Sequence, residues 1–295
     1  MKITNKHNVP ETLVALASRE YYSKGKADYS VTEIISPPRI QRLRRKHHEE
    51  MEQDVSEMLW SLLGSALHVV AERGQHEGYT TEERLYAEID GVTLSGAIDI
   101  QKTTPDGILI TDYKFTSAWA LRQDKPEWEA QQNIYAWLVR KAKKTPVIGV
   151  QICALIRDWS RREAAVKADY PQAPIQVIDL PLWDNEQAET YITERLNAHR
   201  ESKVAADWGD ELPPCSAEDR WVRGDAWAVM RKGLKRASKV FDNEDDAKNF
   251  VATLNGNVGA YVEKRPGEAV RCTGNFCGVN QWCSQYQASL KGEQS

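Results

Sequence analysis

The stretch ITDYKFTSAW, residues 110–119, places two opposite charges at the end of an apolar segment. Residues 108–110 are Ile-Leu-Ile, a run that predicts a buried β-strand. Because residues two apart share one face of a strand, Asp112 and Lys114 should project side by side. Burying such charges is costly unless they are paired or bound to a ligand. The stretch therefore raises the question of what these two charges bind.

The overall composition is that of an ordinary globular protein. The chain has 295 residues, of which 41% are hydrophobic and 28% charged, enough for one large domain or two modest ones. No apolar run reaches the ~18 residues of a membrane helix. The start, MKITNKHNVP, lacks the apolar core of a signal peptide, so we expect a cytoplasmic protein without membrane contact.

A net charge of −4 provides no general attraction for nucleic acid. DNA binding would have to come from local basic clusters, such as residues 37–48 and 140–144, for which the alternative is a solvated surface.

Hydrophobic periodicity predicts a mixed series of helices and strands up to residue 205. Turn signals at Asp90-Gly91 and at residues 105–107 join three strands into a meander. The predicted elements are a helical or irregular lead-in (1–48), a helix with an apolar stripe (49–73), the meander strands (84–89, 92–100 and 107–115), a helix (127–143), two buried strands (147–156 and 175–182) and a helix (185–202).

The last third of the chain differs in character, and the predicted domains are residues 1–205 and 206–295. Residues 227–241 predict a basic hairpin that turns at Gly233, and the acidic start of residues 242–254 suits a helix N-terminus. Residues 259–264 then return as a strand. A cysteine-bearing segment follows, so we expect a small β-β-α-β insertion with a cysteine-rich closure.

Further polar residues surround the Asp112–Lys114 pair in a regular order. Gly64 and His68 are four residues apart on one helix face, where the glycine allows close approach. Asp99 ends the second meander strand and can lie beside Asp112 if the two strands pair antiparallel. Singly, each residue has a structural explanation, as a hydrogen-bonded histidine, a turn-closing aspartate or a surface ion pair.

Two more residues, Gln131 and Tyr135, share a face of the helix at 127–143. Alone they would be helix surface and core edge. Together with the preceding residues they could bring one imidazole, two carboxylates, a lysine, an amide and a phenol to one end of a sheet.

This order resembles the PD-(D/E)xK nuclease superfamily, specifically the branch with the RecB and AddB nuclease domains and the CRISPR-associated and phage exonucleases. The resemblance covers roughly residues 30–290; here the acidic position is Asp rather than Glu, and the first Asp does not follow Pro. The matching motifs are GSALH with His68, GAID with Asp99, DYK with Asp112 and Lys114, and QQNIY with Gln131 and Tyr135. The resemblance implies an α/β (α+β) restriction-endonuclease-like core with a mixed central sheet flanked by helices.

The resemblance also implies a metal-dependent DNA nuclease, of the exonuclease kind. Mg²⁺ or Mn²⁺ would be held by Asp99, Asp112 and His68, with the Tyr113 carbonyl as an addition. Lys114 would orient or deprotonate the attacking water, or stabilise charge on the phosphate. The catalytic set would be Asp99, Asp112 and Lys114, together with Gln131 and Tyr135, which would hold the lysine or the DNA backbone.

Five cysteines in a cytosolic protein favour free thiols or metal ligands over disulfides. Cys153 lies in an apolar strand and suits core packing. The other four suit either tetrahedral zinc or an iron–sulfur cluster, and they are Cys215, Cys272, Cys277 and Cys283. The resembling nucleases hold a [4Fe–4S] cluster whose first ligand precedes the G-x-x-x-H helix. This chain has ISPPRI there, without cysteine, so we assign Cys215 as the fourth ligand.

The predicted setting is phage or recombination-type DNA processing, with single-stranded DNA or duplex ends as substrate and a recombination protein, an annealing protein or a helicase as partner. The sequence contains no P-loop, which argues against a built-in helicase motor. Two alternatives stay open. One is a non-catalytic DNA-binding or adaptor module on the same fold, and the other is an RNA-directed nuclease.

Overall fold

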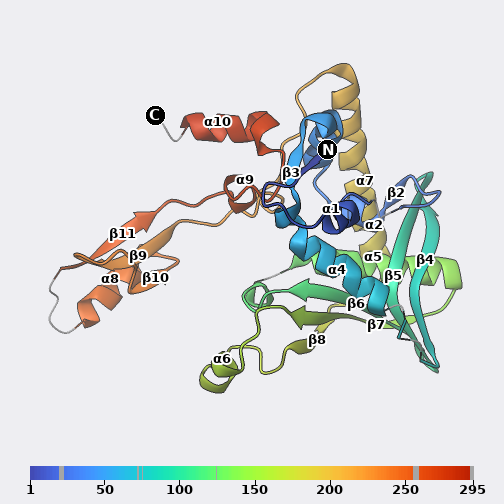
Figure 1. Cartoon of the computed structure of the whole chain (residues 1–295), viewed down its shortest axis with the longest axis horizontal. Coiled ribbons are helices and arrows are strands. Elements are labelled where there is room, and N and C mark those ends of the chain that lie inside the picture. The colour runs from blue at the N-terminus through green and yellow to red at the C-terminus, as the bar shows by residue number, and fades with distance from the viewer. Residues whose placement is uncertain (20–22, 72, 75, 124, 255–258, 293–295) are drawn as a thin grey trace. The chain divides into compact units, whose positions relative to one another are not determined.

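The computed structural model describes residues 1–19, 23–71, 73–74, 76–123, 125–254 and 259–292, and the chain divides into two compact units (Figure 1). The first unit comprises residues 1–38 and 47–207. The second comprises residues 39–46 and 208–295. The segment 39–46, which sequence alone placed in the first domain, therefore belongs with the C-terminal part of the chain.

A mixed sheet forms the framework of the first unit. The expected meander is present, since β4 and β5 pair antiparallel across the turn at Asp90, and β5 and β6 pair antiparallel across the turn at residues 105–106. The β6–β7 pair is parallel, as is β2–β5, and the β7–β8 pair is antiparallel. The mixed α/β fold is thereby confirmed. In order across the sheet the strands are β2 (Tyr29–Ser30), β5 (Val92–Thr104), β6 (Gly107–Thr116), β7 (Val147–Ile156) and β8 (Ile175–Leu180), with β4 (Tyr79–Ile89) also paired with β5.

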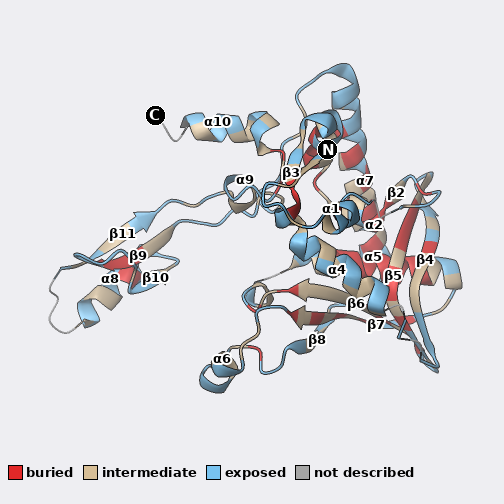
Figure 2. Ribbon diagram, viewed as in Figure 1, coloured by how far each residue is buried: buried red, intermediate tan, exposed pale blue. Residues whose placement is uncertain are grey.

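Helix α5 (Pro126–Lys143) crosses one face of this sheet and forms the centre of the core (Figure 2). It begins with proline, whose fixed φ suits the first helical turn. Residues 130–139 are all buried, because α2 (Val31–Ile35) and α7 (Asn185–Trp208) also contribute to the core around the helix. Trp137 and Leu138 are fully buried.

Helix α4 (Leu59–Ala71) lies on the other face of the sheet, where Trp60 contacts Phe115 of β6 (Figure 1). It starts ten residues later than predicted. Two short 3₁₀ segments, η1 (His48–Glu50) and η2 (Val55–Met58), and strand β3 (Glu52–Asp54) occupy the predicted first turns. The Asp54 side chain, which accepts from the Ser56 backbone N–H, interrupts the helix there.

The apolar stripe of α4 is not a buried face, since none of its residues is buried. Leu63 is 41% exposed and Val70 63% exposed. The close approach expected at Gly64 is also absent, because a Cβ there would meet nothing within 4 Å. The expectation at Gly64 was wrong because periodicity shows which residues share a face, and not which neighbour covers it.

The remaining elements of the first unit are short. The N-terminal lead-in contains strands as well as helices, with β1 paired parallel to β3. The short elements are β1 (Lys2–Thr4), α1 (Glu11–Ala17), η3 (Ala120–Arg122) and α6 (Arg161–Val166).

The second unit contains a three-stranded antiparallel sheet in the order β10 (Lys239–Phe241), β9 (Ala226–Arg231), β11 (Ala260–Arg265). Helix α8 (Glu244–Thr253) packs on it, in the expected β-β-α-β order, over a small core that includes Val229 and Ala247. Its other elements are most of α3 (Pro38–Lys46), α9 (Val270–Thr273), η4 (Asn280–Trp282) and α10 (Ser284–Gly292). In the described part of the chain no helix is long and apolar enough to cross a membrane.

Candidate active site

Asp99 and Asp112 lie where β5 and β6 begin to separate. The hydrogen-bonded ladder of these strands ends at the pair Ile100–Thr111, and the two aspartates are the next residue on each strand. The antiparallel pairing that the sequence predicted for these strands is therefore present. Both carboxylates are buried, with exposed fractions of 6% for Asp99 and 2% for Asp112. Asp99 Oδ2 also accepts a hydrogen bond of 2.8 Å from the backbone N–H of Tyr113.

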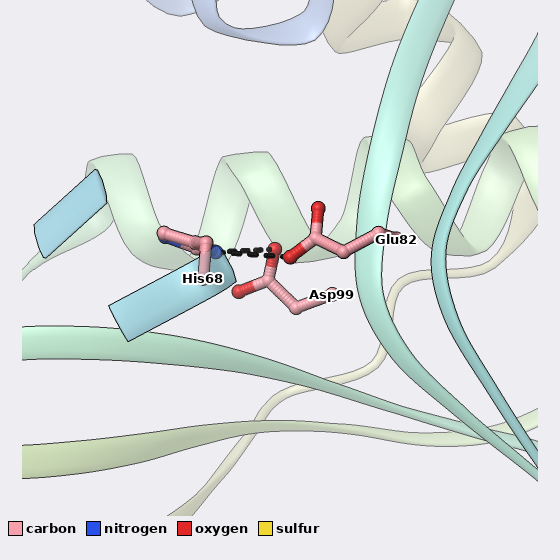
Figure 3. A group of neighbouring side chains, drawn as sticks. All are labelled: His68, Glu82 and Asp99. Atoms are coloured by element: carbon pink, nitrogen blue, oxygen red, sulfur yellow. Dashed lines mark hydrogen bonds and ion pairs between the residues drawn. The ribbon is translucent and has the colours of Figure 1, made fainter. Parts of the chain in front are cut away.

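A third carboxylate, Glu82 of β4, joins this site and was not predicted. His68 Nδ1 lies 3.2 Å from Glu82 Oε1 and 3.4 Å from Asp99 Oδ1 (Figure 3). One ligand atom from each of these three residues lies within 4.8 Å of the others. Imidazole and carboxylate groups at this spacing can hold a divalent cation.

Glu82 has a backbone conformation that is unusual in a strand. Its φ is +51°, in the left-handed region that residues other than glycine rarely adopt. Such local strain is typical of positions where a side chain is redirected for function. The hairpin register could have located this residue: Ile89 pairs with Val92, and counting seven residues outward along each strand brings Glu82 opposite Asp99.

The ionisable groups of the site have shifted pKa values. Hydrogen bonding to Asp99, and then to Glu82, raises the pKa of His68 to about 10. An imidazolium thus lies between the two carboxylates. Burial raises the pKa of Asp112 to about 6, although the ammonium group of Lys114 favours its ionised form. The site therefore holds one carboxylate, Asp112, that the folded protein makes costly to ionise.

Asp112 Oδ2 is a buried carboxylate oxygen with an incomplete set of partners. The Lys114 ammonium group lies 2.7 Å from it, as an ion pair. This oxygen is nevertheless buried and, within the described residues, lacks a hydrogen bond of acceptable geometry. A buried carboxylate oxygen in this state can coordinate a cation. The donor set present therefore fits a divalent metal ion.

Lys114 is held from the side of α5. Its Nζ donates to Gln131 Oε1 at 2.9 Å, and Gln131 Nε2 donates to Tyr135 Oη at 2.9 Å. Gln131 and Tyr135 were predicted to hold either Lys114 or the DNA backbone. This geometry agrees with the first of these roles. Gly96 makes room for the arrangement, because a Cβ there would lie 2.6 Å from a ring carbon of Tyr135.

The site thus combines four acidic or imidazole side chains with a lysine aimed by a helix. Asp99, Asp112 and Glu82 come from three adjacent strands, and His68 comes from α4. A metal ion among oxygen ligands, with an ammonium group beside it, suits the cleavage of phosphate esters. The Tyr113 carbonyl stays a predicted ligand, since only its N–H is seen in contact with the site.

Fold and site together define a metal-dependent nuclease. A family model described as the PD-(D/E)XK nuclease superfamily matches residues 4–284, and the chain belongs to that superfamily. This membership implies a metal-dependent phosphodiesterase, with DNA as the substrate.

Comparison with curated proteins finds no match. Among solved structures, the protein SSO0001 is similar at 16% identity and a TM-score of 0.40, over 63% of this chain and 82% of its own. A protein from Eubacterium rectale, named as a suspected exonuclease, is similar at 14% identity and a TM-score of 0.28, over 65% and 70% of the two chains. With TM-scores this low, neither likeness informs on activity.

Four cysteines line one pocket of the second unit, namely Cys215, Cys272, Cys277 and Cys283. All are buried except Cys272, which is half-buried. The pKa of Cys215 is raised to about 12, chiefly by burial. Gln285 fixes the Cys215 backbone through two hydrogen bonds, accepting from its N–H at 2.8 Å and donating to its carbonyl at 3.0 Å.

Arg39, which is 3% exposed, also lines this pocket. Its Nε donates to Cys283 Sγ at 3.3 Å, and its terminal nitrogens donate to Glu211 at 2.6 Å and to Ser284 Oγ at 2.5 Å. The segment ISPPRI (residues 35–40), which has no cysteine, therefore contributes Arg39 to the lining of the cysteine pocket. Cys153 belongs to the first unit, where it is half-buried in β7 between the buried residues Ile152 and Ala154. Cys153 is therefore more exposed than the core position that the sequence predicted for it.

Proposed function

We propose that this chain is a Mg²⁺- or Mn²⁺-dependent DNA exonuclease of the branch that contains the RecB and AddB nuclease domains. The observation that carries the proposal is the buried Asp112 oxygen, which accepts no well-formed hydrogen bond from the described residues and has Lys114 aimed at it. This oxygen lies near Asp99 and His68, which belong with Glu82 to the group within 4.8 Å, and a ligand that completes the site would satisfy it.

Each residue of the site then has a role. Asp99, Asp112 and His68, with Glu82 and the Tyr113 carbonyl, would hold the metal ion. A bound divalent ion would supply an activated water and neutralise charge on the phosphate. His68 must release its proton to become a ligand. Lys114, fixed by Gln131, would orient the water or stabilise charge on the phosphate.

The assignment to exonuclease chemistry, and to phage or recombination-type DNA processing, follows from the motif order in the sequence. In such a setting a recombination protein, an annealing protein or a helicase would act with the chain on single-stranded DNA or duplex ends.

We assign a [4Fe–4S] cluster to the cysteine pocket of the second unit. The four thiols come from distant segments yet line one pocket. A tetrahedral zinc ion, which four thiolates can also hold, is the alternative occupant. The cluster would staple residue 215 to the C-terminal segment.

The test is cleavage of end-labelled DNA. Purified protein with Mg²⁺ or Mn²⁺ should release short products from the ends of linear single- or double-stranded DNA, and leave circular DNA intact. Chelation should stop the reaction. Lys114→Ala should remove it, whereas Lys102→Ala, an exposed lysine of the same sheet, should not. Cuts in circular DNA would indicate an endonuclease, cleavage of RNA alone an RNA-directed enzyme, and DNA binding without any cleavage an adaptor module.

A further inference from the structure

The turn between β9 and β10 concentrates positive charge on the second unit. Residues 231–239, which we call the basic turn, contain five lysines or arginines and no acidic residue. All five are exposed. Across the described chain none of the five forms an ion pair within the 4.0 Å limit for such contacts. They are Arg231, Lys232, Lys235, Arg236 and Lys239.

The other basic residues of the same small sheet and helix behave differently. Lys248 pairs with Glu244 at 2.9 Å, Lys264 with Asp225 at 2.6 Å, and Arg265 with Glu263 at 3.1 Å. Outside the basic turn, the cations of the small sheet and its helix thus have acidic partners. In the basic turn the fold supplies none.

The acidic residues of the unit are used elsewhere. Residues 244–246 are all acidic and occupy the first turn of α8, where negative charge is favourable beside the helix N-terminus. The basic turn therefore bears a local excess of positive charge that repels itself. Because no ion pair with the described residues offsets this repulsion, a ligand with closely spaced negative charges accounts for the excess best.

The basic turn is held on a defined backbone. Gly233 has a φ of +85°, which permits the chain to reverse there, and the Leu234 N–H donates to the Arg231 carbonyl at 3.0 Å. The Ser238 N–H donates to the Val229 carbonyl at 2.8 Å and closes the base of the turn.

Lys239, at the end of the turn, lies over two aromatic rings. Its Nζ is 4.8 Å from the centre of the Phe241 ring and 5.2 Å from that of Phe250. The cations are thus presented by a hairpin anchored in the small core, rather than by a loose tail.

We propose that the basic turn binds the phosphate backbone of the DNA substrate, as a contact additional to the catalytic site. The inference rests on the proposed function, which brings DNA to the chain. A DNA strand carries one negative charge per ~3.4 Å, a density that a cluster of cations can neutralise. The charged side chains of the turn are all lysines and arginines. Contacts from these side chains to phosphate carry no sequence information, so the turn would bind DNA of any sequence.

DNA is favoured over an acidic protein because the chain belongs to a nuclease superfamily. The net charge of the whole chain is −4, so any polyanion gains nothing from the overall field and must be attracted locally. A second contact would keep the enzyme on its DNA between successive cleavage steps.

The experiment compares two double variants in full-length protein carrying Asp112→Asn, so that the DNA is not consumed. Lys235→Gln/Arg236→Gln removes two charges from the basic turn. Lys248→Gln/Lys264→Gln, the matched control, removes two paired charges from the same small unit. Binding to fluorescent 30-nucleotide single strands and 30-base-pair duplexes is measured by anisotropy over a series of salt concentrations.

The turn variant should bind duplex about tenfold more weakly at low salt. Its slope of log affinity against log salt should fall by about 2, because each phosphate that is no longer neutralised lowers the slope by ~0.9. The control should stay within twofold. Equal weakening in both variants would show a general charge effect and overturn the proposal, as would an unchanged slope in the turn variant. Unaltered melting temperatures establish that both variants are folded.

The two proposals can fail separately. If wild-type protein cleaves DNA while the turn variant binds normally, the basic turn does not bind DNA and the nuclease assignment stands. If binding depends on the turn but wild-type protein cleaves nothing, the DNA-binding role of the turn stands and the nuclease assignment falls.

Discussion

The carboxylate site of the first unit and the cysteine pocket of the second gather their ligands by different means. Asp99, Asp112 and Glu82 are carried by adjacent strands of one sheet, and α5, buried along residues 130–139, aims Lys114. The cysteines come from a loop after α7, from the short helix α9 and from the short segments on either side of η4.

The difference lies in what supports each site before a ligand binds. The sheet and α5 are stable for reasons unrelated to the metal, so a ligand of that site can be changed without loss of the fold. The second unit has only a small apolar core, and small units of this kind depend on staples. Substitutions in the site of the first unit should therefore reduce cleavage without lowering stability. Substitutions in the cysteine pocket should lower the stability of the second unit.

The largest effect is expected in the first unit. Asp112→Ala and Lys114→Ala should each reduce cleavage by ~10²–10³ or more, because each removes a group that acts on the reacting phosphate. Single-turnover rates measure the reduction, and circular dichroism should show an intact fold. Near-wild-type rates in either variant would remove these residues from the catalytic set.

In the second unit, loss of a ligand should alter the fold. Anaerobically purified wild-type protein should be brown and contain iron and acid-labile sulfide. Cys272→Ser should bleach it and expose residues 206–295 to protease, because the metal staple is removed. Cys153→Ser, outside the pocket, is the control and should keep the colour. Stoichiometric zinc without iron would make this a structural zinc site, and protein without metal despite ample iron would end the ligand assignment.

A smaller effect should appear in the response of the first unit to metal. Mn²⁺ at 100 times its dissociation constant should stabilise wild-type protein by about 2.7 kcal/mol, since it binds only the folded state. Asp99→Ala should lose most of this shift, while Asp106→Ala, in an exposed turn, should keep it. Equal metal-induced rises in melting temperature for Asp99→Ala and wild type would show that Asp99 is not a ligand.

The smallest effect concerns the proton on His68. Because its folded pKa is raised to about 10, His68 stabilises the metal-free protein fully below its unfolded pKa, ~6.5, and this contribution disappears as pH rises through 10. The difference in melting temperature between wild type and His68→Gln, without metal, should therefore shrink from pH 6 to pH 10. A difference that is constant over this range would contradict the imidazolium between Glu82 and Asp99.

Much of the first site could be predicted from local signals. The Asp90-Gly91 turn sets the register of the hairpin, and alternation along the next strand places Asp112 and Lys114 together. The i, i+4 spacing of Gln131 and Tyr135 similarly puts both on one helix face, where they form a chain of hydrogen bonds to Lys114. Each of these relations acts within a few residues of the chain, or across one turn.

The errors came where a neighbour distant in sequence decides the outcome. The start of α4 is set by the Asp54 cap and the β1–β3 pairing, so periodicity alone extended the helix too far. The exposure of Leu63 and the open space beside Gly64 likewise depend on what lies opposite α4.

By itself, the sequence determined the mixed fold, the meander, the central helix and four of the five side chains of the candidate site, because turn chemistry and side-chain periodicity are local properties. Only the tertiary structure decided that Glu82, within β4, turns its carboxylate towards His68 and that Arg39 enters the cysteine pocket. It also showed which cations of the small sheet are paired and which are not. These features depend on contacts between segments far apart in the chain, and such contacts are set by packing, charge and backbone strain acting together.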